Sequence, residues 1–441
     1  MANLNPFHAM IDVVVVGMGY VGIPVAVEFA RVGMSVVGID IVVDKVEKIN
    51  RGEYPLKGKE PELPDLLESV VSSGRLRATT DYSPCSEAKN IIVAVETPFD
   101  KDALSPNYTA LRSAMTDIGR RLKRNTLVVI ESTIAPLTTN NLARKILEKE
   151  SGLIAGKDFY LAHCPERLMV GRLLRNLREY DRVIGGIDPE STRRAMELYS
   201  KICKGKLHPT NALTAEIVKT VENTYRDVQI AFANEVALIC EHLGVNAYEV
   251  RALVNTCPYR DMHVPGAGVG GHCIPKDPWL LVYGVREKFD PLLIKTARKI
   301  NDYMPVHVAE LVISMLREEV SPLCNAKVCV LGAAFIENSD DTRNSPSEGL
   351  INALRAEGVN VVVHDPYVGE FMGMAVEKDV YESLRGADCL VLMTAHEEYK
   401  SMDMERVAKV MRRKIIVDGR NFFDDGLCKS LGFKYKGVGK G

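Results

Sequence analysis

Short apolar runs alternate with longer amphipathic segments through the first part of the chain. The runs at 12–16, 35–39, 90–95, 127–131, 159–163 and 182–185 have the length and composition of buried strands. Segments with helical or charged patterns, such as 111–123 and 137–149, lie between them. Strands that alternate with helices predict a parallel sheet covered on both faces.

The middle of the chain has a different pattern. Residues 214–243 contain neither proline nor glycine, and apolar residues recur there at helical spacing. Gly244 follows directly, as is typical just after a helix. We predict one long helix of about 45 Å, at 1.5 Å per residue. A second helical stretch at 291–319 is expected to be interrupted near Pro305.

Strand-like runs return at 327–331, 359–364, 389–393 and 414–417. The second half repeats the first in outline, since VVVVGMG…SVVGID and KVCVLGA…NVVVHDP both give a strand, a glycine turn and a strand ending in Asp. We predict an α/β fold of two Rossmann-like, doubly wound parallel-sheet domains joined by a helical central domain with a long helix. The expected boundaries are 1–205, 206–318 and 319–441.

Composition narrows the possible partners. The 441 residues carry a net charge of −2 with both signs interspersed, which argues against nucleic acid or a membrane surface as a partner. No apolar stretch is long enough to span a membrane, so a cytoplasmic location is expected. The ten cysteines include no CxxC pair, which favours a reducing compartment and gives no reason to expect a metal site.

A dinucleotide fingerprint follows the first strand. Gly17, Gly19 and Gly22 have the GxGxxG spacing and precede a predicted helix at 23–32. The first glycine allows the tight turn, the second the approach of a pyrophosphate and the third close helix packing. Asp40 ends the next strand, where an acid binds ribose hydroxyls and repels a 2′-phosphate. We expect NAD rather than NADP, bound by Asp40 and the whole loop, which also includes Met18, Tyr20 and Val21.

A cysteine follows a second glycine-rich loop. Residues 265–278 read PGAGVGGHCIPKDP, so that Cys273 closely follows the glycines and precedes Lys276 and Asp277 by three and four residues. A thiol beside an ammonium group on an amide-rich loop can become a nucleophile, whereas most buried cysteines are inert. His272 suggests a Cys–His dyad. We disfavour it because adjacent side chains of extended backbone point apart.

Lys219 and Asn223 lie four residues apart on the predicted long helix and share a face. They interrupt an apolar surface, which points to a functional role. The alternative is that Lys219 is solvated on the helix exterior. Neighbouring charged residues are expected to be solvated or ion-paired, namely Glu216, Glu222, Arg226 and Asp227.

Nine motifs in order resemble the UDP-glucose/GDP-mannose dehydrogenase family over nearly the whole chain. They are GMGYVG at 17–22, ETP at 96–98, EST at 131–133, CPER at 164–167, AEIVKTVENTYRDVQIAFANE at 215–235, GVGGHCIPKDP at 268–278, GAAF at 332–335, DDTRNSP at 340–346 and DGRNFFD at 418–424. The resemblance implies an NAD-binding first domain, a dimer formed by the central domain and a UDP-sugar-binding last domain. It also implies a four-electron oxidation that uses two NAD per sugar.

The resemblance also assigns roles. Cys273 would be the nucleophile, with Lys219, Asn223 and Asp277 as catalytic neighbours, and Glu166 and Thr133 would position water or transfer protons. NAD contacts would include Thr97, Thr133, Lys276 and Arg343. The sugar nucleotide would meet Glu166, Arg167, Lys219, Asn223, Gly270, Phe335 and Arg420, together with one or more of Tyr259, Arg260 and His263.

Two features bear on the substrate. Ile336 follows GAAF where this family usually has lysine, and GGHC in place of GGSC resembles members acting on UDP-N-acetylhexosamines. We expect UDP-N-acetyl-D-mannosamine as substrate, with UDP-N-acetylglucosamine or UDP-glucose as alternatives. A single-step hydroxyacid-type dehydrogenase would need neither Cys273 nor a second nucleotide-binding half. A non-catalytic NAD-binding subunit would not need the four residues Lys219, Asn223, Cys273 and Asp277.

Overall fold

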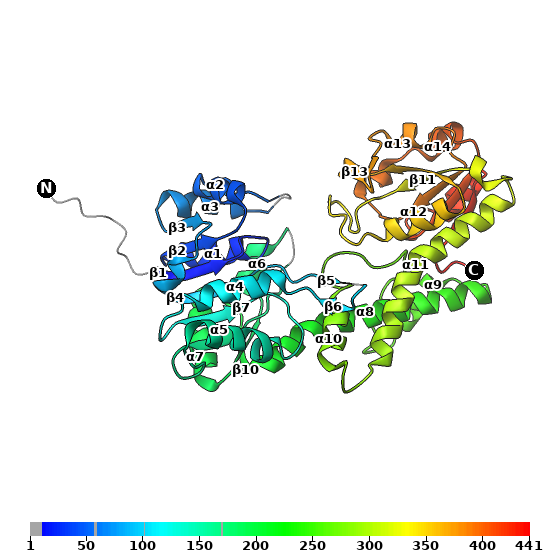
Figure 1. The fold of residues 1–441 in the computed structure, drawn as a ribbon. Coiled ribbons are helices and arrows are strands. Elements are labelled where there is room, and N and C mark those ends of the chain that lie inside the picture. The colour runs from blue at the N-terminus through cyan, green and yellow to red at the C-terminus, as the bar shows by residue number, and fades with distance from the viewer. Residues whose placement is uncertain (1–10, 57–59, 101, 169–170) are drawn as a thin grey trace. The chain divides into compact units, whose positions relative to one another are not determined.

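The computed structural model describes residues 11–56, 60–100, 102–168 and 171–441 (Figure 1). The chain forms two compact units. The first unit contains the described residues up to Glu222 together with Trp279–Asp290, and the second contains Asn223–Pro278 and Pro291–Gly441. The units are described separately below.

An eight-stranded sheet forms the centre of the first unit, in the order β10-β9-β8-β7-β4-β1-β2-β3. Neighbouring strands are parallel except for β8 and β9, which are antiparallel. The strands are β1 (Ile11–Val16), β2 (Val36–Ile39), β3 (Leu76–Thr79), β4 (Ala88–Val93), β7 (Leu127–Ile130), β8 (Tyr160–His163), β9 (Arg182–Gly186) and β10 (Leu207–Asn211). A separate antiparallel pair is formed by β5 (Phe99–Asp100) and β6 (Ser105–Pro106).

Helices cover both faces of this sheet (Figure 1). Val13 and Val15 of β1 pack in one core cluster, and Val14 and Val16 pack in the other, as the two-residue period of a strand requires. The first face is covered by α1 (Gly22–Arg31), α2 (Val43–Asn50), α3 (Leu63–Ser72), α6 (Leu173–Glu179) and α7 (Pro189–Tyr199). The other is covered by η1 (Ser83–Ser86), α4 (Thr109–Gly119), η2 (Thr139–Ala143) and α5 (Arg144–Ser151).

The second unit contains a five-stranded parallel sheet in the order β12-β11-β15-β16-β17. Its strands are β11 (Lys327–Leu331), β12 (Asn360–His364), β15 (Cys389–Leu392), β16 (Ile415–Asp418) and β17 (Lys434–Gly437), beside the short pair β13 (Glu370–Phe371) and β14 (Met374–Ala375). The other elements of this unit are α9 (Ala247–Val254), α11 (Leu292–Arg317), η3 (Leu323–Asn325), α12 (Pro346–Ala356), α13 (Val380–Leu384), η4 (Glu397–Ser401), α14 (Met404–Val410) and α15 (Asp425–Ser430). These two α/β sheets with intervening helices confirm the predicted fold class.

Two helices cross the boundary between the units. They are α8 (Ala212–Leu243) and α10 (Asp277–Val285). The prediction of one long helix at 214–243 is confirmed by α8. No helix of the described residues is both long and apolar enough to cross a membrane.

The expected interruption near Pro305 is wrong, because α11 continues through this residue. Proline removes one helical hydrogen bond and crowds the preceding turn. Here its ring is buried against Gly268 and Gly349. A Cβ added at these glycines would lie only 2.9 Å and 3.1 Å from atoms of the proline ring. Packing against these glycines accommodates the proline inside a continuous helix.

Besides the short pairs β5–β6 and β13–β14, the apolar pattern did not predict three strands of the two main sheets. They are β3 and β10, at the two edges of the first sheet, and β17, at one edge of the second. The sequences LRAT, LHPTN and KYKG are polar, because an edge strand is only partly covered.

A buried ion pair joins α8 and α11 in the second unit. Asp227 and Arg298 are both almost fully buried and form a salt bridge. The amide of Asn301 donates to the Asp227 carboxylate at 2.8 Å and to its backbone carbonyl at 2.9 Å. Removing one member of such a pair leaves the other charge buried without compensation.

We therefore predict that Asp227→Ala lowers the free energy of unfolding by about 3–5 kcal/mol, measured by urea denaturation. Glu397→Ala is the control, because Glu397 forms an exposed ion pair with Lys400 and its loss should cost less than about 1 kcal/mol. Equal effects of the two substitutions would contradict a structural role for the buried pair.

Candidate active site

The carboxyl ends of five adjacent strands carry expected site residues of the first unit. Gly17 follows β1, Asp40 follows β2, Thr97 lies beyond β4, Thr133 beyond β7 and Glu166 beyond β8. These strands are neighbours and mutually parallel, so their carboxyl ends meet at one edge of the sheet. Ligands of open α/β sheets bind at this edge.

The turn between β1 and α1 has the shape that a dinucleotide requires. Gly17 has φ of +94°, and a side chain there would lie 2.6 Å from the Ala94 carbonyl oxygen. A Cβ on Gly22 would lie 1.8 Å from the Gly17 oxygen, whereas one on Gly19 would meet no protein atom within 4 Å. The open space at Gly19 and the uncapped N-terminus of α1 fit a pyrophosphate.

Asp40 is held beside this turn by three hydrogen bonds. Its carboxylate accepts from the Met18 amide at 2.9 Å, the Val42 amide at 3.0 Å and the Lys45 ammonium at 2.6 Å. Asp40 is therefore fixed at the position expected for a ribose-binding acid. Lys45 adds a cation that the sequence did not single out, since nothing distinguishes it there from other helix-surface lysines.

The ETP and EST loops are joined directly. The Thr97 hydroxyl donates to the Thr133 carbonyl at 2.6 Å, and the Ser132 hydroxyl donates to the Val95 carbonyl at 2.6 Å. Thr97 and Thr133 are both nearly buried. The two threonines expected near the cofactor are thus brought together.

Lys219 lies beside Glu166 rather than in solvent. The ammonium is 3.6 Å from a Glu166 carboxylate oxygen, and the two residues are only 7% and 9% exposed. The solvated alternative for Lys219 is therefore wrong. Arg167, next in the CPER motif, pairs with Glu222 of α8 at 3.2 Å and donates to the Asp181 carbonyl at 2.7 Å.

Glu216 is neither solvated nor ion-paired, contrary to expectation. Its two carboxylate oxygens accept from the amides of Leu137 and Thr139, each at 2.7 Å. Burial raises the pKa of Glu216 to about 7, although these hydrogen bonds act in the opposite direction. Glu216 therefore anchors the segment after the EST motif to α8, one helical turn from Lys219.

In the second unit, three of the expected catalytic residues come together. The Asn223 amide donates to a carboxylate oxygen of the buried Asp277 at 2.6 Å. The Asp277 amide donates to the Cys273 carbonyl at 2.9 Å, and the Lys276 ammonium lies 3.5 Å from the Asp277 carboxylate. Cys273 itself is partly exposed, whereas seven of the ten cysteines are buried.

The cysteine loop packs on the last domain through its glycines. Cβ atoms on Gly270 and Gly271 would lie 2.4 Å and 2.8 Å from Phe335, and one on Gly266 would lie 2.8 Å from the Arg420 guanidinium. The Gly271 amide also donates to the Arg343 carbonyl at 2.8 Å. Three expected residues, Phe335, Arg343 and Arg420, thus contact the loop, which itself contains the expected Gly270.

Three further expected substrate residues are exposed or half-buried. Tyr259 is fully exposed with φ of +66°, and Arg260 beside it is also exposed. His263 lies 3.3 Å from the Gln229 side chain, and burial lowers the pKa of its imidazole. Ile336, in place of the usual lysine, is half exposed.

His272 departs from the expectation that its side chain points away from Cys273. Its Nδ1 lies 3.8 Å from the Cys273 sulfur. The chain bends at residues 271–273 instead of extending, so the alternation of side chains on which the expectation rested does not apply.

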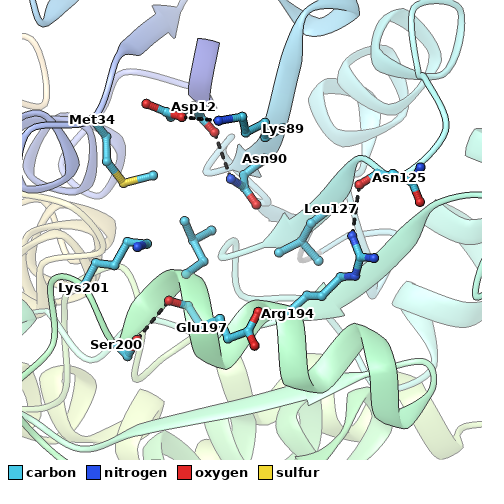
Figure 2. Close-up of a pocket in the computed structure, with 11 residues that line it drawn as sticks. Asp12, Met34, Lys89, Asn90, Asn125, Leu127, Arg194, Glu197, Ser200 and Lys201 are labelled. Carbon is cyan, nitrogen blue, oxygen red and sulfur yellow. Dashed lines mark hydrogen bonds and ion pairs between the residues drawn. The ribbon is translucent and has the colours of Figure 1, made fainter. Parts of the chain in front are cut away.

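A cavity of about 800 Å³ lies at the opposite, amino-terminal edge of the first sheet. Figure 2 shows Asp12 paired with Lys89 at 2.9 Å, and Arg194 donating to the Asn125 carbonyl at 3.3 Å. These charged groups are already paired with other residues of the same chain. We therefore assign the candidate site to the carboxyl edge, where the glycine turn leaves open space.

An NAD-type turn in the first unit and a thiol loop on the second sheet define a dehydrogenase with two nucleotide-binding domains. The chain belongs to the UDP-glucose/GDP-mannose dehydrogenase family and is an NAD-dependent UDP-sugar dehydrogenase. The family's NAD binding domain matches residues 11–203, its central domain 213–303 and its UDP binding domain 329–425. NAD is accordingly the cofactor.

Several relatives match over nearly the full length. The UDP-N-acetyl-D-mannosamine dehydrogenase of Pyrococcus horikoshii is 41% identical over 97% of this chain and 99% of its own. A solved structure of the UDP-D-ManNAc dehydrogenase from Pyrococcus horikoshii has a TM-score of 0.91 and 40% identity, covering 98% and 100% of the two chains. The NDP-N-acetyl-D-galactosaminuronic acid dehydrogenase from Methanosarcina mazei Go1 has a TM-score of 0.90 and 43% identity, covering 98% and 96%.

The glycine geometry predicts different effects for two alanine substitutions. Gly19→Ala should leave the thermal unfolding midpoint unchanged but weaken NAD binding at least about tenfold, because its methyl group enters the space left for the pyrophosphate. Gly22→Ala should lower the unfolding midpoint, because its methyl group would overlap the Gly17 carbonyl. Calorimetric NAD titration and thermal unfolding measure both effects, and unchanged NAD affinity in Gly19→Ala would place the cofactor elsewhere.

Proposed function

We propose that this chain oxidises the C6 hydroxyl of a UDP-N-acetylhexosamine to a carboxylate, in two NAD-dependent steps through a covalent Cys273 intermediate. The observation that carries the proposal is the partly exposed Cys273, whose backbone carbonyl accepts from Asp277 of the hydrogen-bonded Asn223–Asp277 pair. A dehydrogenase that removes one hydride needs no such nucleophile. Retaining the aldehyde on sulfur allows one site to oxidise the same carbon twice.

UDP-N-acetyl-D-mannosamine is the substrate we favour. It is named for the relative from Pyrococcus horikoshii and for several others at 35–38% identity. UDP-N-acetylglucosamine and UDP-glucose remain alternatives. The relative from Methanosarcina mazei is named for N-acetyl-D-galactosaminuronic acid. A nucleotide-linked N-acetylgalactosamine is therefore the fourth sugar to test.

The cofactor would be held by the glycine turn of residues 17–22 and by Asp40, with further contacts from Thr97, Thr133, Lys276 and Arg343. Bound NAD supplies the hydride acceptor in both oxidations. The open space at Gly19 and the fixed carboxylate of Asp40 support this placement. The hydrogen bond from Thr97 to the Thr133 carbonyl supports the proposal that these two loops together line the cofactor site.

The protein groups then have distinct tasks. The Lys219 ammonium and the Asn223 amide, one turn apart on α8, donate hydrogen bonds to the C6 oxygen as negative charge develops on it. Cys273 bonds to the aldehyde carbon and gives a thiohemiacetal, which the second oxidation converts to a thioester. Glu166 or Asp277 orients the water that hydrolyses the thioester, with Thr133 beside it.

The sugar nucleotide would lie against the surface on which the cysteine loop packs. Phe335 and Arg420 support this, because they pack against loop glycines that include Gly270 and lie in the region matched by the UDP binding domain. We also propose contacts from Glu166 and Arg167 and from one or more of Tyr259, Arg260 and His263. We place the reaction in the cytoplasm, since a reducing compartment keeps free thiols such as that of Cys273 from forming disulfides.

We further propose a homodimer built on α8. Tyr225, Phe232 and Ile239 recur every seven residues along this helix and are 63%, 59% and 52% exposed. An apolar stripe at this spacing fits the same stripe of a second copy, as in coiled-coil packing.

Phe232→Glu should convert the dimer to monomer, because it places a charge in the middle of the apolar stripe. Sedimentation velocity measures the change. The control is Leu427→Glu, a charge placed at a 51% exposed leucine of α15, which should leave the dimer intact. A wild-type monomer, or a Phe232→Glu dimer, would contradict the proposed interface.

The reaction predicts two NADH formed per sugar oxidised. The measurement is NAD reduction at 340 nm (the NADH absorption band) with limiting amounts of each UDP-sugar in turn, and UDP-N-acetyl-D-mannosamine should give the highest kcat/KM. Cys273→Ser should abolish the complete oxidation, whereas Cys257→Ser, which changes an exposed thiol, should not. One NADH per sugar with a carbonyl product, or full activity of Cys273→Ser, would overturn the covalent mechanism.

A further inference from the structure

The imidazole of His272 lies against the thiol of Cys273. Nδ1 is 3.8 Å from Sγ, which is within hydrogen-bonding reach of a sulfur atom. Gly271, with φ of +91°, turns the chain immediately before this pair. Its amide donates to the Arg343 carbonyl at 2.8 Å, and its carbonyl accepts from the Asn344 amide at 3.1 Å. The bend that brings imidazole and thiol together is therefore fixed from both sides.

The segment that holds Gly271 also carries a carboxylate, because Asp341 lies two residues before Arg343 and pairs with its guanidinium. Burial alone would raise the pKa of Asp341, but hydrogen bonds from Arg343 and the charge of His272 lower the pKa overall. Asp341 is therefore ionised at neutral pH, and an ionised carboxylate stabilises an imidazolium near it.

Lys276 and Asp277 are less suited to activate the thiol than the sequence indicated. The Lys276 ammonium lies 3.5 Å from the Asp277 carboxylate, which offsets its charge, and Asp277 also accepts from Asn223. Charged groups on the segments near His272 include Asp341, itself paired with Arg343, and the Lys276–Asp277 pair on the same loop. The imidazole of His272 lies within hydrogen-bonding reach of the sulfur atom.

We propose that His272 is a catalytic residue that accepts the proton of the Cys273 thiol, and that the charge of Asp341 stabilises the resulting imidazolium. The inference rests on the proposed role of Cys273. The S–H bond breaks as the proton moves from Sγ to Nδ1, and the sulfur electron pair forms the bond to the aldehyde carbon. The carbonyl electron pair moves to oxygen, which takes the proton back from the imidazolium. Thiohemiacetal formation is thus balanced, with no net release of a proton.

The test measures the thiol itself, without substrate. Iodoacetamide is the probe, and alkylation of Cys273 is followed by peptide mass spectrometry between pH 5 and 10 in a Cys257→Ser, Cys324→Ser background, which removes the two exposed thiols. His272→Ser and His272→Gln should move the pH midpoint of alkylation upward by about one unit, which is about a tenfold loss of rate below the midpoint. Asp341→Asn should move it in the same direction by less.

The matched control is His208→Gln, which removes an exposed histidine that pairs with Asp181 in the first unit and should leave the profile unchanged. An unchanged midpoint in both folded His272 variants would overturn the proposal, and so would a shift of equal size in the control. If His272→Ser does not fold, the longer amide of His272→Gln retains the volume and supplies the answer.

The two proposals fail separately. An unshifted alkylation profile with an inactive Cys273→Ser variant removes His272 and leaves the covalent mechanism. A shifted profile with a fully active Cys273→Ser variant removes the covalent mechanism and leaves His272 as a neighbour that activates a thiol without catalytic use. KM for the sugar should change little in His272→Gln while kcat falls, because the imidazole acts on sulfur and not on the bound nucleotide.

Discussion

The need to satisfy buried and half-buried polar groups on α8 constrains segments of both units. Glu216, Lys219, Asn223, Asp227 and Asn234 recur at intervals of three, four, four and seven residues, and so lie along one side of the helix. Each binds a different segment: the loop after EST, the CPER motif, the N-terminus of α10, α11 and the start of the cysteine loop. An unpaired polar group in such a position costs about 1–3 kcal/mol, so each contact constrains the segment that it binds.

This polar side of α8 explains how loops remote in sequence acquire defined positions. Within the first unit, Glu216 fixes the chain beyond Thr133, and one turn later Lys219 reaches Glu166. Within the second unit, Asn223 holds Asp277, and the Asn234 side chain accepts from the Gly266 amide at 2.9 Å. Both ends of the loop that carries Cys273 are thereby tied to one rigid helix.

Strand prediction succeeded for the inner strands of the two main sheets and failed at three of their four edges. The runs at β1, β7, β11 and β15 are covered on both faces, so nearly all of their residues are apolar and buried. The run at β4 is buried in its second half. The edge strands β3, β10 and β17 have charged and polar residues, and their pairing depends on the neighbouring strand rather than on their own composition. Pro305 illustrates the same limit, since its place inside α11 depends on Gly268 and Gly349, which are distant in sequence.

The sequence by itself determined the fold class, the long helix, the NAD fingerprint and the family, because each depends on local periodicity or on residues at fixed spacing. Only the tertiary structure decided what surrounds each side chain. It buried Lys219 beside Glu166, left Tyr259 in solvent and bent the chain so that His272 meets Cys273. The physical reason is that burial, pairing and loop direction depend on contacts between segments far apart in the chain, which spacing along the sequence does not specify.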